Sequence, residues 1–219
     1  MYALSIDHKP NRPLKLVCLG AHADDIEIGC GGLILALLER HQNVEVDWIV
    51  FSSTSKRSRE ARQSAELFLQ GAHRRRVVLK RFRDSFFPHE GDRIKKVFET
   101  LKKQLNPDIV LTHYREDRHQ DHRVLSDLAW NTFRDHLVLE YEIPKFDGDL
   151  GVPNCFVPLD PATCARKVAY LMAAFGSQRD KHWFSDETFM SLMRLRGMEC
   201  RAPGGYAEAF YARKVPLNI

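Results

Sequence analysis

The sequence has few of the features that mark disulfide-bonded, secreted or membrane-spanning proteins. Its 219 residues include only five cysteines, which are far apart and form no CxxC pair. Neither a disulfide framework nor a thiolate zinc site is therefore indicated, and a reducing cytosol is the expected compartment. Apolar runs fall short of the roughly 20 residues that a membrane-spanning helix needs. Residues 1–13 lack the apolar core of a signal peptide. We therefore expect a cytoplasmic protein without a membrane span.

An excess of one charge is also missing, since 33 lysines and arginines face 29 acidic residues for a net charge of +4. The basic residues are scattered, apart from 74–76 and 102–103, so we expect no nucleic-acid partner. A small anionic substrate and assembly as a homo-oligomer are both compatible with this balance. With 44% hydrophobic and 28% charged residues, the composition is that of a soluble globular protein. The length predicts one domain, 1–219.

Short apolar runs alternate with segments of helical spacing along the chain. The pattern predicts strands at 14–20, 44–51, 76–82, 109–112, 137–143 and 155–158, and helices at 26–40, 59–70, 93–105, 122–133, 161–174 and 183–195. Residues 207–215 fit either a final helix or a final strand. Glu140 and Glu142 alternate along a strand and are expected to face solvent. The alternation predicts an α/β fold with a mostly parallel, doubly wound sheet, a three-layer Rossmann-like arrangement.

The stretch from Ala21 to Gly32, A-H-A-D-D-I-E-I-G-C-G-G, follows the first predicted strand directly. His22 and Asp25 are three residues apart, close enough to hold one metal ion from a single turn. Asp24 lies between them and is expected to point elsewhere, free for proton transfer. Taken alone, an aspartate here is equally well a helix N-cap, and the glycines simply let strand and helix pack closely.

A second polar cluster, H-Y-R-E-D-R-H-Q-D-H-R, follows the predicted strand at 109–112. It places three histidines and two aspartates within ten residues: His113, Asp117, His119, Asp121 and His122. The carboxyl ends of parallel strands share one edge, so both clusters should face one cleft. Two imidazoles and a carboxylate with an open position are typical of catalytic zinc, which lowers the pKa of bound water to about 7. The sequence therefore predicts a metal-hydrolase site.

The two motifs together, A-H-x-D-D and then H-x-D-H about a hundred residues later, resemble the PIG-L/LmbE-like family of zinc-dependent de-N-acetylases. The resemblance implies that His22, Asp25 and His122 bind Zn²⁺, with Fe²⁺ or Co²⁺ as related ions. It implies that Asp24 is the general base. It further implies that His119 stabilises the oxyanion and protonates the leaving amine, and that Asp121 orients a neighbouring histidine and tunes its pKa.

Weaker candidates for substrate binding lie after two other predicted strands. Arg57, with Glu60, resembles a pair that similar proteins place near the substrate, although a solvated helix start explains it as well. Asp84 resembles an acceptor for a sugar hydroxyl, and its alternative is a turn aspartate. The family usually has proline where this chain has Ala23. Alanine leaves the turn less restricted in the unfolded chain, at a cost of up to about 1 kcal/mol.

These inferences lead us to expect a metal-dependent hydrolase that removes an acetyl group from a small amino-sugar conjugate of the N-acetylglucosamine type. The amino-sugar part of this expectation rests on the resemblance alone. A metal-dependent amidase or esterase acting on a substrate without a sugar stays open as an alternative. So does a nucleotide-binding module whose glycines cradle phosphate, although G-C-G-G lacks the G-x-G-x-x-G spacing.

Overall fold

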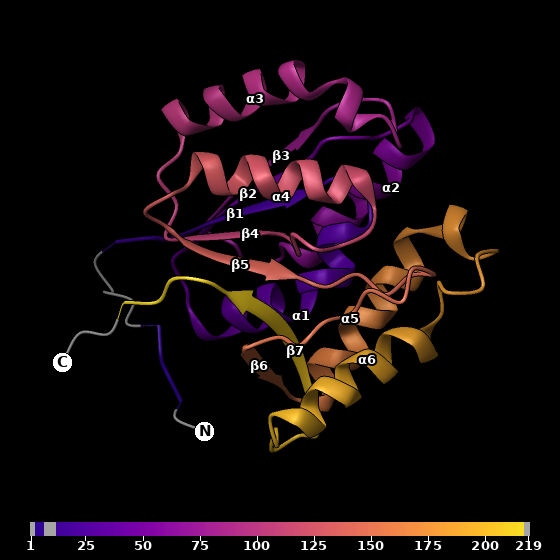
Figure 1. Cartoon of the computed structure of the whole chain (residues 1–219). Helices are drawn as coiled ribbons and strands as arrows, with labels where there is room; N and C mark the ends of the chain where they lie inside the picture. Colours follow the sequence, from indigo (N-terminus) through magenta and orange to yellow (C-terminus); the bar gives the residue numbers. More distant parts are fainter. Residues whose placement is uncertain (1–2, 7–11, 217–219) are drawn as a thin grey trace.

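The computed structural model describes residues 3–6 and 12–216, which fold around a seven-stranded sheet (Figure 1). The strand order is β3-β2-β1-β4-β5-β7-β6. The strands are β1 (Leu14–Gly20), β2 (Val44–Val50), β3 (Arg74–Leu79), β4 (Ile109–His113), β5 (Leu137–Tyr141), β6 (Cys155–Leu159) and β7 (Tyr206–Ala212). Strands β1 to β5 are parallel, whereas β7 runs antiparallel to both β5 and β6. The predicted mostly parallel sheet is therefore confirmed.

Helices cover both faces of this sheet, which confirms the predicted three layers (Figure 1). One face carries α1 (Asp25–Arg40), α2 (Ser55–Phe68), α5 (Pro161–Ala174) and α6 (Asp186–Glu199), and the other carries α3 (Gly91–Gln104) and α4 (Gln120–Thr132). Two short 3₁₀ helices, η1 (Phe87–His89) and η2 (Gly176–Gln178), lie in the connections. These connections, together with the turns that follow the parallel strands, form the site described below.

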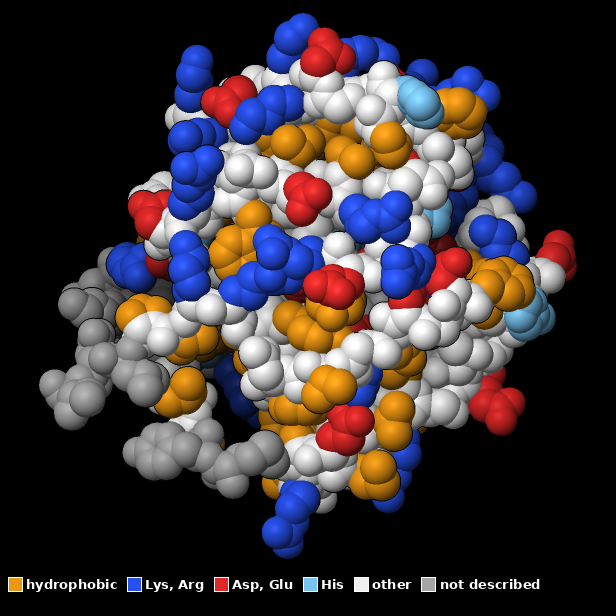
Figure 2. All heavy atoms as spheres, in the orientation of Figure 1, with side chains coloured by type: hydrophobic (Ala, Val, Ile, Leu, Met, Phe, Trp, Pro, Cys, Tyr) orange, Lys and Arg blue, Asp and Glu red, His pale blue; other side chains and the backbone are white. Residues whose placement is uncertain are grey.

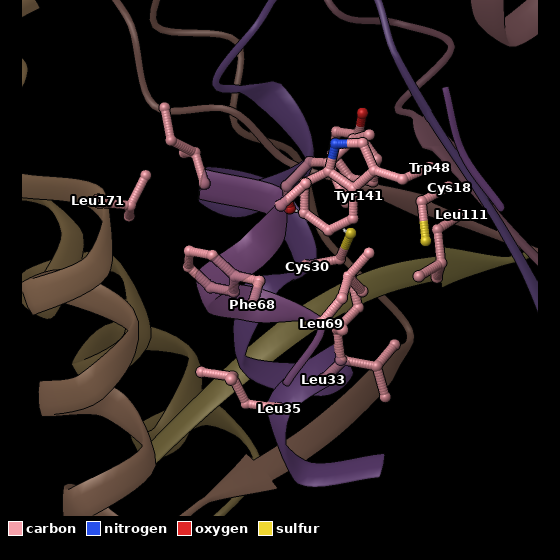
Figure 3. Close-up of a cluster of buried hydrophobic side chains, with 14 of the residues drawn as sticks. Cys18, Cys30, Leu33, Leu35, Trp48, Phe68, Leu69, Leu111, Tyr141 and Leu171 are labelled. Carbon is pink, nitrogen blue, oxygen red and sulfur yellow. Dashed lines mark hydrogen bonds between the residues drawn. The ribbon is translucent and has the colours of Figure 1, made fainter. Parts of the chain in front are cut away.

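Two hydrophobic cores separate the layers. The larger core lies between the sheet and α1, α2 and α5, and Figure 3 shows Trp48 and Phe68 within it, with ring centroids 6.3 Å apart. The smaller core lies under α3 and α4, where Phe51 stacks on Phe98 at 5.3 Å. Each large apolar side chain buried in this way contributes about 1.5–3 kcal/mol. The two cores hold the carboxyl edge of the sheet in a fixed arrangement.

Helix α1 is kinked at Cys30, whose backbone angles of φ −144° and ψ 16° are not helical. The break frees the backbone N–H groups of Gly32 and Leu33, and each donates to the carboxylate of Glu208 on β7 at 2.7 Å. Lys167 on α5 forms a buried ion pair with Glu208 at 2.6 Å. The second part of α1 is therefore capped by a side chain from the last strand.

Two predicted helix boundaries are wrong for a local reason. Helix α2 begins at Ser55, inside the expected polar turn, because Thr54 accepts a hydrogen bond from the backbone of Arg57 and caps the helix. The helix predicted at 183–195 instead spans Asp186–Glu199, because Ser185 caps it through the backbone N–H of Thr188 at 3.1 Å. In both cases a hydroxyl residue sets the helix start.

The expectation that Glu140 and Glu142 face solvent is also wrong. Glu140 is fully buried and accepts from Arg213 Nε at 2.8 Å, and Glu142 pairs with Arg196 at 2.6 Å. Strand β7 returns antiparallel beside β5, so β5 is an interior strand rather than an edge strand. Arg213, which follows β7, and Arg196 on α6 cover the two carboxylates.

The surface agrees with the scattered charge of the sequence, since basic and acidic side chains are interspersed on the face that Figure 2 shows. Each of the five cysteines lies in the described part of the chain and is a free thiol. Within residues 3–6 and 12–216, no helix combines the length and the hydropathy that crossing a bilayer requires.

Candidate active site

Both polar motifs lie at the carboxyl edge of two neighbouring strands. Strand β1 pairs with β4, with Cys18 opposite Leu111, so the turn after β1 adjoins the loop after β4. A cleft of about 400 Å³ opens there. Its floor and opening include seven of the predicted site residues: His22, Asp24, Asp25, Arg57, Asp84, His119 and His122. The expectation that the two motifs face one cleft is confirmed.

Three side-chain atoms from the two motifs converge on one point in this floor. His22 Nδ1 lies 3.4 Å from Asp25 Oδ2 and 3.2 Å from His122 Nε2, and the last two atoms are 3.6 Å apart. A tetrahedral zinc ion with bonds of about 2.0–2.2 Å holds its ligand atoms roughly 3.3–3.6 Å apart. The donor types and their spacing therefore fit one divalent metal ion.

The charges around these atoms also suit a cation. Burial opposes a charge on His22, but Asp25, Asp121 and Asp84 raise the pKa of its imidazole well above the usual value. Burial would raise the pKa of Asp25, yet the surrounding histidines hold it well below its usual range. Burial, together with neighbouring His113, lowers the pKa of His122 to about 3. His122 is therefore neutral at pH 7, the form in which imidazole binds metal.

Asp121 lies behind His22 and is itself firmly held. It is fully buried in the first turn of α4, and its two oxygens accept from the backbone N–H groups of Ser85 at 2.7 Å and Phe87 at 3.1 Å. Its Oδ2 lies 3.3 Å from His22 Nε2. Ser85 has a φ of 66°, a left-handed backbone angle that is uncommon outside glycine. The Asp121 carboxylate is therefore fixed within hydrogen-bond distance of the His22 imidazole.

Asp117 contacts the imidazole of His122 as Asp121 contacts that of His22. Its sequence context indicated no role for it. Its Oδ2 is 2.9 Å from His122 Nδ1 and 2.9 Å from Lys145 Nζ, and its Oδ1 accepts from the backbone of His119 at 2.8 Å. Burial alone would raise the pKa of Asp117, but the hydrogen bond from His122 and the nearby ammonium of Lys145 hold it well below the usual range. The only sign of this contact in the sequence was that Asp117 lies five residues before His122.

His113 is a third histidine beneath the site, and it is fully buried. Its ring stacks on His122 with centroids 3.9 Å apart, and its Nε2 lies 3.1 Å from Asp25 Oδ2. The backbone N–H of Ala21 donates to the same Nε2 at 3.0 Å. His113 therefore supports two of the converging side chains from below.

His119 caps helix α4 and faces the cleft beside the metal-binding atoms. Its Nδ1 accepts from the backbone N–H of Asp121 at 3.3 Å, and its ring lies 4.8 Å from that of His22. Burial, followed by the nearby charge of His22, lowers the pKa of His119. A neutral imidazole whose Nδ1 accepts must carry its proton on Nε2. His119 is thus a hydrogen-bond donor to the cleft.

Asp24 occupies the N-cap position of α1, yet its side chain makes no capping hydrogen bond within the described part of the chain. Its Oδ1 instead lies 2.6 Å from Arg57 NH2, and only 6% of the side chain is exposed. Burial raises the pKa of Asp24, and the ion pair with Arg57 opposes that rise. The N-cap interpretation does not explain this side chain.

Arg57 and Asp84 lie on different sides of the cleft. The guanidinium of Arg57 is largely buried between Asp24 and Glu60, so the solvated-helix alternative is wrong. Asp84 is 68% exposed, and its Oδ1 lies 3.2 Å from His22 Nε2. The hydrogen bond from His22 lowers the pKa of Asp84 to about 2. Asp84 therefore presents an ionised carboxylate at the cleft opening.

Comparison with known proteins places this site within a family. The sequence model of the GlcNAc-PI de-N-acetylase family, PIG-L, matches residues 17–133, more than half of the chain. The chain belongs to the PIG-L family. Both motifs lie within the matched segment, whereas α5, α6, β6 and β7 lie outside it. The PIG-L match therefore covers the candidate metal site, and the C-terminal part of the cleft lies outside the matched residues.

Solved structures share the fold at low sequence identity. The conserved protein TT1542 from Thermus thermophilus is 20% identical, with a TM-score of 0.72 over 94% of this chain and 97% of its own. The N,N'-diacetylchitobiose deacetylase from Pyrococcus horikoshii is 19% identical, with a TM-score of 0.66 over 91% and 84%. The 4-carboxy-2-hydroxymuconate hydratase GalB from Pseudomonas putida is 18% identical, with a TM-score of 0.72 over 94% and 99%. A deacetylase and a hydratase thus share this fold, so the reaction must be argued from the site.

Proposed function

We propose that this PIG-L member is a zinc-dependent hydrolase that removes an N-acetyl group from a small amino-sugar conjugate. The observation that carries the proposal is the convergence of His22 Nδ1, Asp25 Oδ2 and His122 Nε2 within 3.2–3.6 Å of one another. This set leaves the cleft side open, as a catalytic site requires, whereas a structural zinc site is closed by a fourth protein ligand.

A divalent ion held by these three residues would act as a Lewis acid toward water and the acetyl carbonyl. Two nitrogens and one carboxylate oxygen suit zinc, and iron or cobalt are alternatives with similar ligand preferences. Asp121 and Asp117 hold the two imidazoles from behind. Such outer partners fix the orientation of the ligands and raise their basicity.

Asp24 and His119 divide the proton transfers in this proposal. Arg57 holds Oδ1 of Asp24, which leaves Oδ2 to take a proton from the attacking water. Burial raises the pKa of Asp24 toward the range in which a carboxylate works well as a base. The Nε2–H of His119 donates to the developing oxyanion, and His119 relays to the leaving amine the proton that Asp24 took from water, so that both side chains end in their starting protonation states. The C–N bond breaks, and acetate and a free amine are released.

The cleft also supports a substrate the size of a sugar conjugate. Its volume of about 400 Å³ lies within the usual range for small-molecule sites. Asp84 contacts His22 through Oδ1, which leaves its second oxygen to accept from a sugar hydroxyl at the opening, and Arg57 retains donors beside Asp24. On this basis we propose both as substrate-facing residues.

The nucleotide-binding alternative is not favoured by the structure. The backbone N–H groups of Gly32 and Leu33, which would cradle a phosphate, already bind Glu208. Gly29 is required for packing instead, since a Cβ there would lie 2.1 Å from the ring of Tyr141. The glycines therefore let α1 approach the sheet, and the site does not resemble a phosphate cradle.

The decisive experiment measures acetate released by zinc-loaded protein from three groups of compounds: N-acetylglucosamine conjugates, N-acetylated amines without a sugar, and acetyl esters. We expect turnover of one or more sugar conjugates, abolished by a strong chelator and restored by zinc. Preference for the sugar-free amides or esters would instead favour the amidase or esterase alternative. Activity that is indifferent to the chelator would contradict the metal site itself.

A further inference from the structure

Glu60 on α2 links the floor of the cleft to one of its walls. It is largely buried, and its Oε2 accepts from Arg57 NH1 at 3.1 Å and from the hydroxyl of Ser177 at 2.6 Å. Its Oε1 accepts from the backbone N–H of Ser177 at 2.8 Å. A single carboxylate therefore holds one residue at the floor and another at the wall.

The wall is the segment 177–183 of the connection between α5 and α6, and it lines the cleft through Gln178, Lys181 and Trp183. The backbone of Lys181 donates to Gln178 at 2.9 Å, and Gln178 Nε2 donates to the Ser177 hydroxyl at 3.0 Å. Ser177 is thus the anchor from which the rest of the wall is built. Its two hydrogen bonds to Glu60 fix that anchor against α2.

On the floor side, Glu60 is connected through Arg57 to Asp24, the proposed base. Arg57 donates NH1 to Glu60 and pairs through NH2 with Asp24 Oδ1 at 2.6 Å. Its guanidinium also lies 5.2 Å from the ring centroid of Phe175, two residues before Ser177. The fixed fork of the guanidinium lets one side chain bind two carboxylates in a defined geometry. Removing Glu60 would leave NH1 of Arg57 with the Ser177 hydroxyl, at 3.3 Å, as its partner in place of a carboxylate.

We propose that Glu60 is a positioning residue that couples the orientation of Asp24 to the position of the 177–183 wall. It acts on Asp24 through Arg57 and on the wall through Ser177. This inference rests on the proposed function, because it assumes that Asp24 is the base. It adds a substrate consequence: conjugates whose attached group reaches Lys181 and Trp183 depend on the anchor more than N-acetylglucosamine itself does.

The kinetic test compares Glu60→Gln and Ser177→Ala with Glu66→Gln, a change at an exposed residue of the same helix. Glu60→Gln should lower kcat about 10- to 100-fold, the factor for a lost charge-assisted hydrogen bond, with the metal content unchanged. Ser177→Ala should raise KM for larger conjugates about tenfold, since it removes the charge-assisted hydrogen bond from the hydroxyl to Glu60 and leaves the backbone one. Glu66→Gln should behave as wild type.

A double-mutant cycle distinguishes an effect of Glu60 that is transmitted through Arg57 from a general loss of stability. If Glu60 acts through Arg57, Arg57→Lys and Glu60→Gln should be non-additive, and the double variant should be little slower than Arg57→Lys alone. Strictly additive effects on kcat, or wild-type kcat in Glu60→Gln, would overturn the proposal.

An activity-free measurement keeps this test separate from the proposed function. Hydrogen exchange of the amides at 177–183 should be faster in Glu60→Ala than in wild type and unchanged in Glu66→Gln. Unchanged protection of the Ser177 amide in Glu60→Ala would refute the anchor. If wild-type protein released no amine from any conjugate, the proposed function would fail while the exchange result still decided whether Glu60 holds the wall.

Discussion

The two halves of the sheet hold their important side chains in different ways. In the half formed by β1 to β4, the site residues lie in turns that directly follow a strand, and neighbouring strands bring the turns together. In the part that follows β5, buried charges pair across long stretches of chain, as in Glu142 with Arg196 and Lys167 with Glu208, each at 2.6 Å. The first half thus carries the chemistry in local motifs, and the second supports it through distant contacts.

This difference leads to opposite expectations for substitutions in the two halves. Changes in the motif turns should alter metal content or rate while the fold persists. Changes to the C-terminal ion pairs should alter stability while the metal ligands persist.

The largest effect is expected for the two adjacent aspartates. Asp24→Asn keeps the shape of the side chain but removes the proton acceptor, so kcat should fall by about 10²–10⁴ with zinc still bound. Asp25→Ala should instead lose zinc, and added metal should restore activity only in part. Zinc per chain and kcat are measured on both variants. Metal loss in Asp24→Asn together with metal retention in Asp25→Ala would reverse the two roles.

A large effect on stability is expected at the buried pair of the C-terminal part. Glu142→Gln leaves Arg196 buried without its main partner, which should lower the free energy of unfolding by on the order of 3 kcal/mol. Urea unfolding measures this change, with Glu199→Gln as the matched control. Glu199 is 34% exposed, and its pairing with the same arginine should be worth less than about 1 kcal/mol. Loss of zinc in folded Glu142→Gln would break the proposed division.

A smaller effect on metal affinity is expected at Asp117. Asp117→Asn weakens the support of His122 Nδ1, so zinc affinity should fall about 10- to 100-fold. Competition with a chromogenic chelator gives the affinity directly. Asp149→Asn is the control, because Asp149 pairs with the same Lys145, at 2.5 Å, whereas the pair with His122 is made by Asp117. Equal losses in the two variants would assign the effect to Lys145 rather than to His122.

The smallest effect is expected at Ala23, which is 1% exposed in the turn after β1. Ala23→Pro restricts the unfolded chain, so we expect a gain in stability of up to about 1 kcal/mol with kcat unchanged. Thermal unfolding and steady-state kinetics check both parts. A less stable variant would show that the backbone at position 23 does not suit proline.

These contrasts also explain how much the sequence could reveal. His22 and Asp25 could be proposed as ligands from their spacing in the turn after a strand, His122 was implied by the resemblance to the family, and the two motifs could be placed together because parallel strands end at one edge. The contact between Arg57 and Asp24 was not accessible, since α2 starts at Ser55 rather than where the apolar spacing begins. The neighbours of Asp84 in sequence could not decide whether it accepts from a sugar hydroxyl or is only a turn residue.

The errors of the sequence analysis concentrate in the second half for a physical reason. Alternation along β5 indicates a solvent-facing side only if nothing covers it, and β7 and Arg213 cover Glu140 from about 70 residues away. Glu60 gives no local sign that it anchors Ser177, because the two residues meet only after α5 has packed against α2. Pairing over such distances is decided by the folded arrangement rather than by spacing.

The central claim is that His22, Asp25 and His122 hold a divalent ion at the carboxyl edge of β1 and β4. A crystal of zinc-loaded protein, measured on both sides of the zinc absorption edge, tests it directly. The account predicts one strong anomalous peak within about 2.0–2.2 Å of His22 Nδ1, Asp25 Oδ2 and His122 Nε2. A peak bound by His113 or His119 in place of these atoms, or no peak at the site, would contradict it.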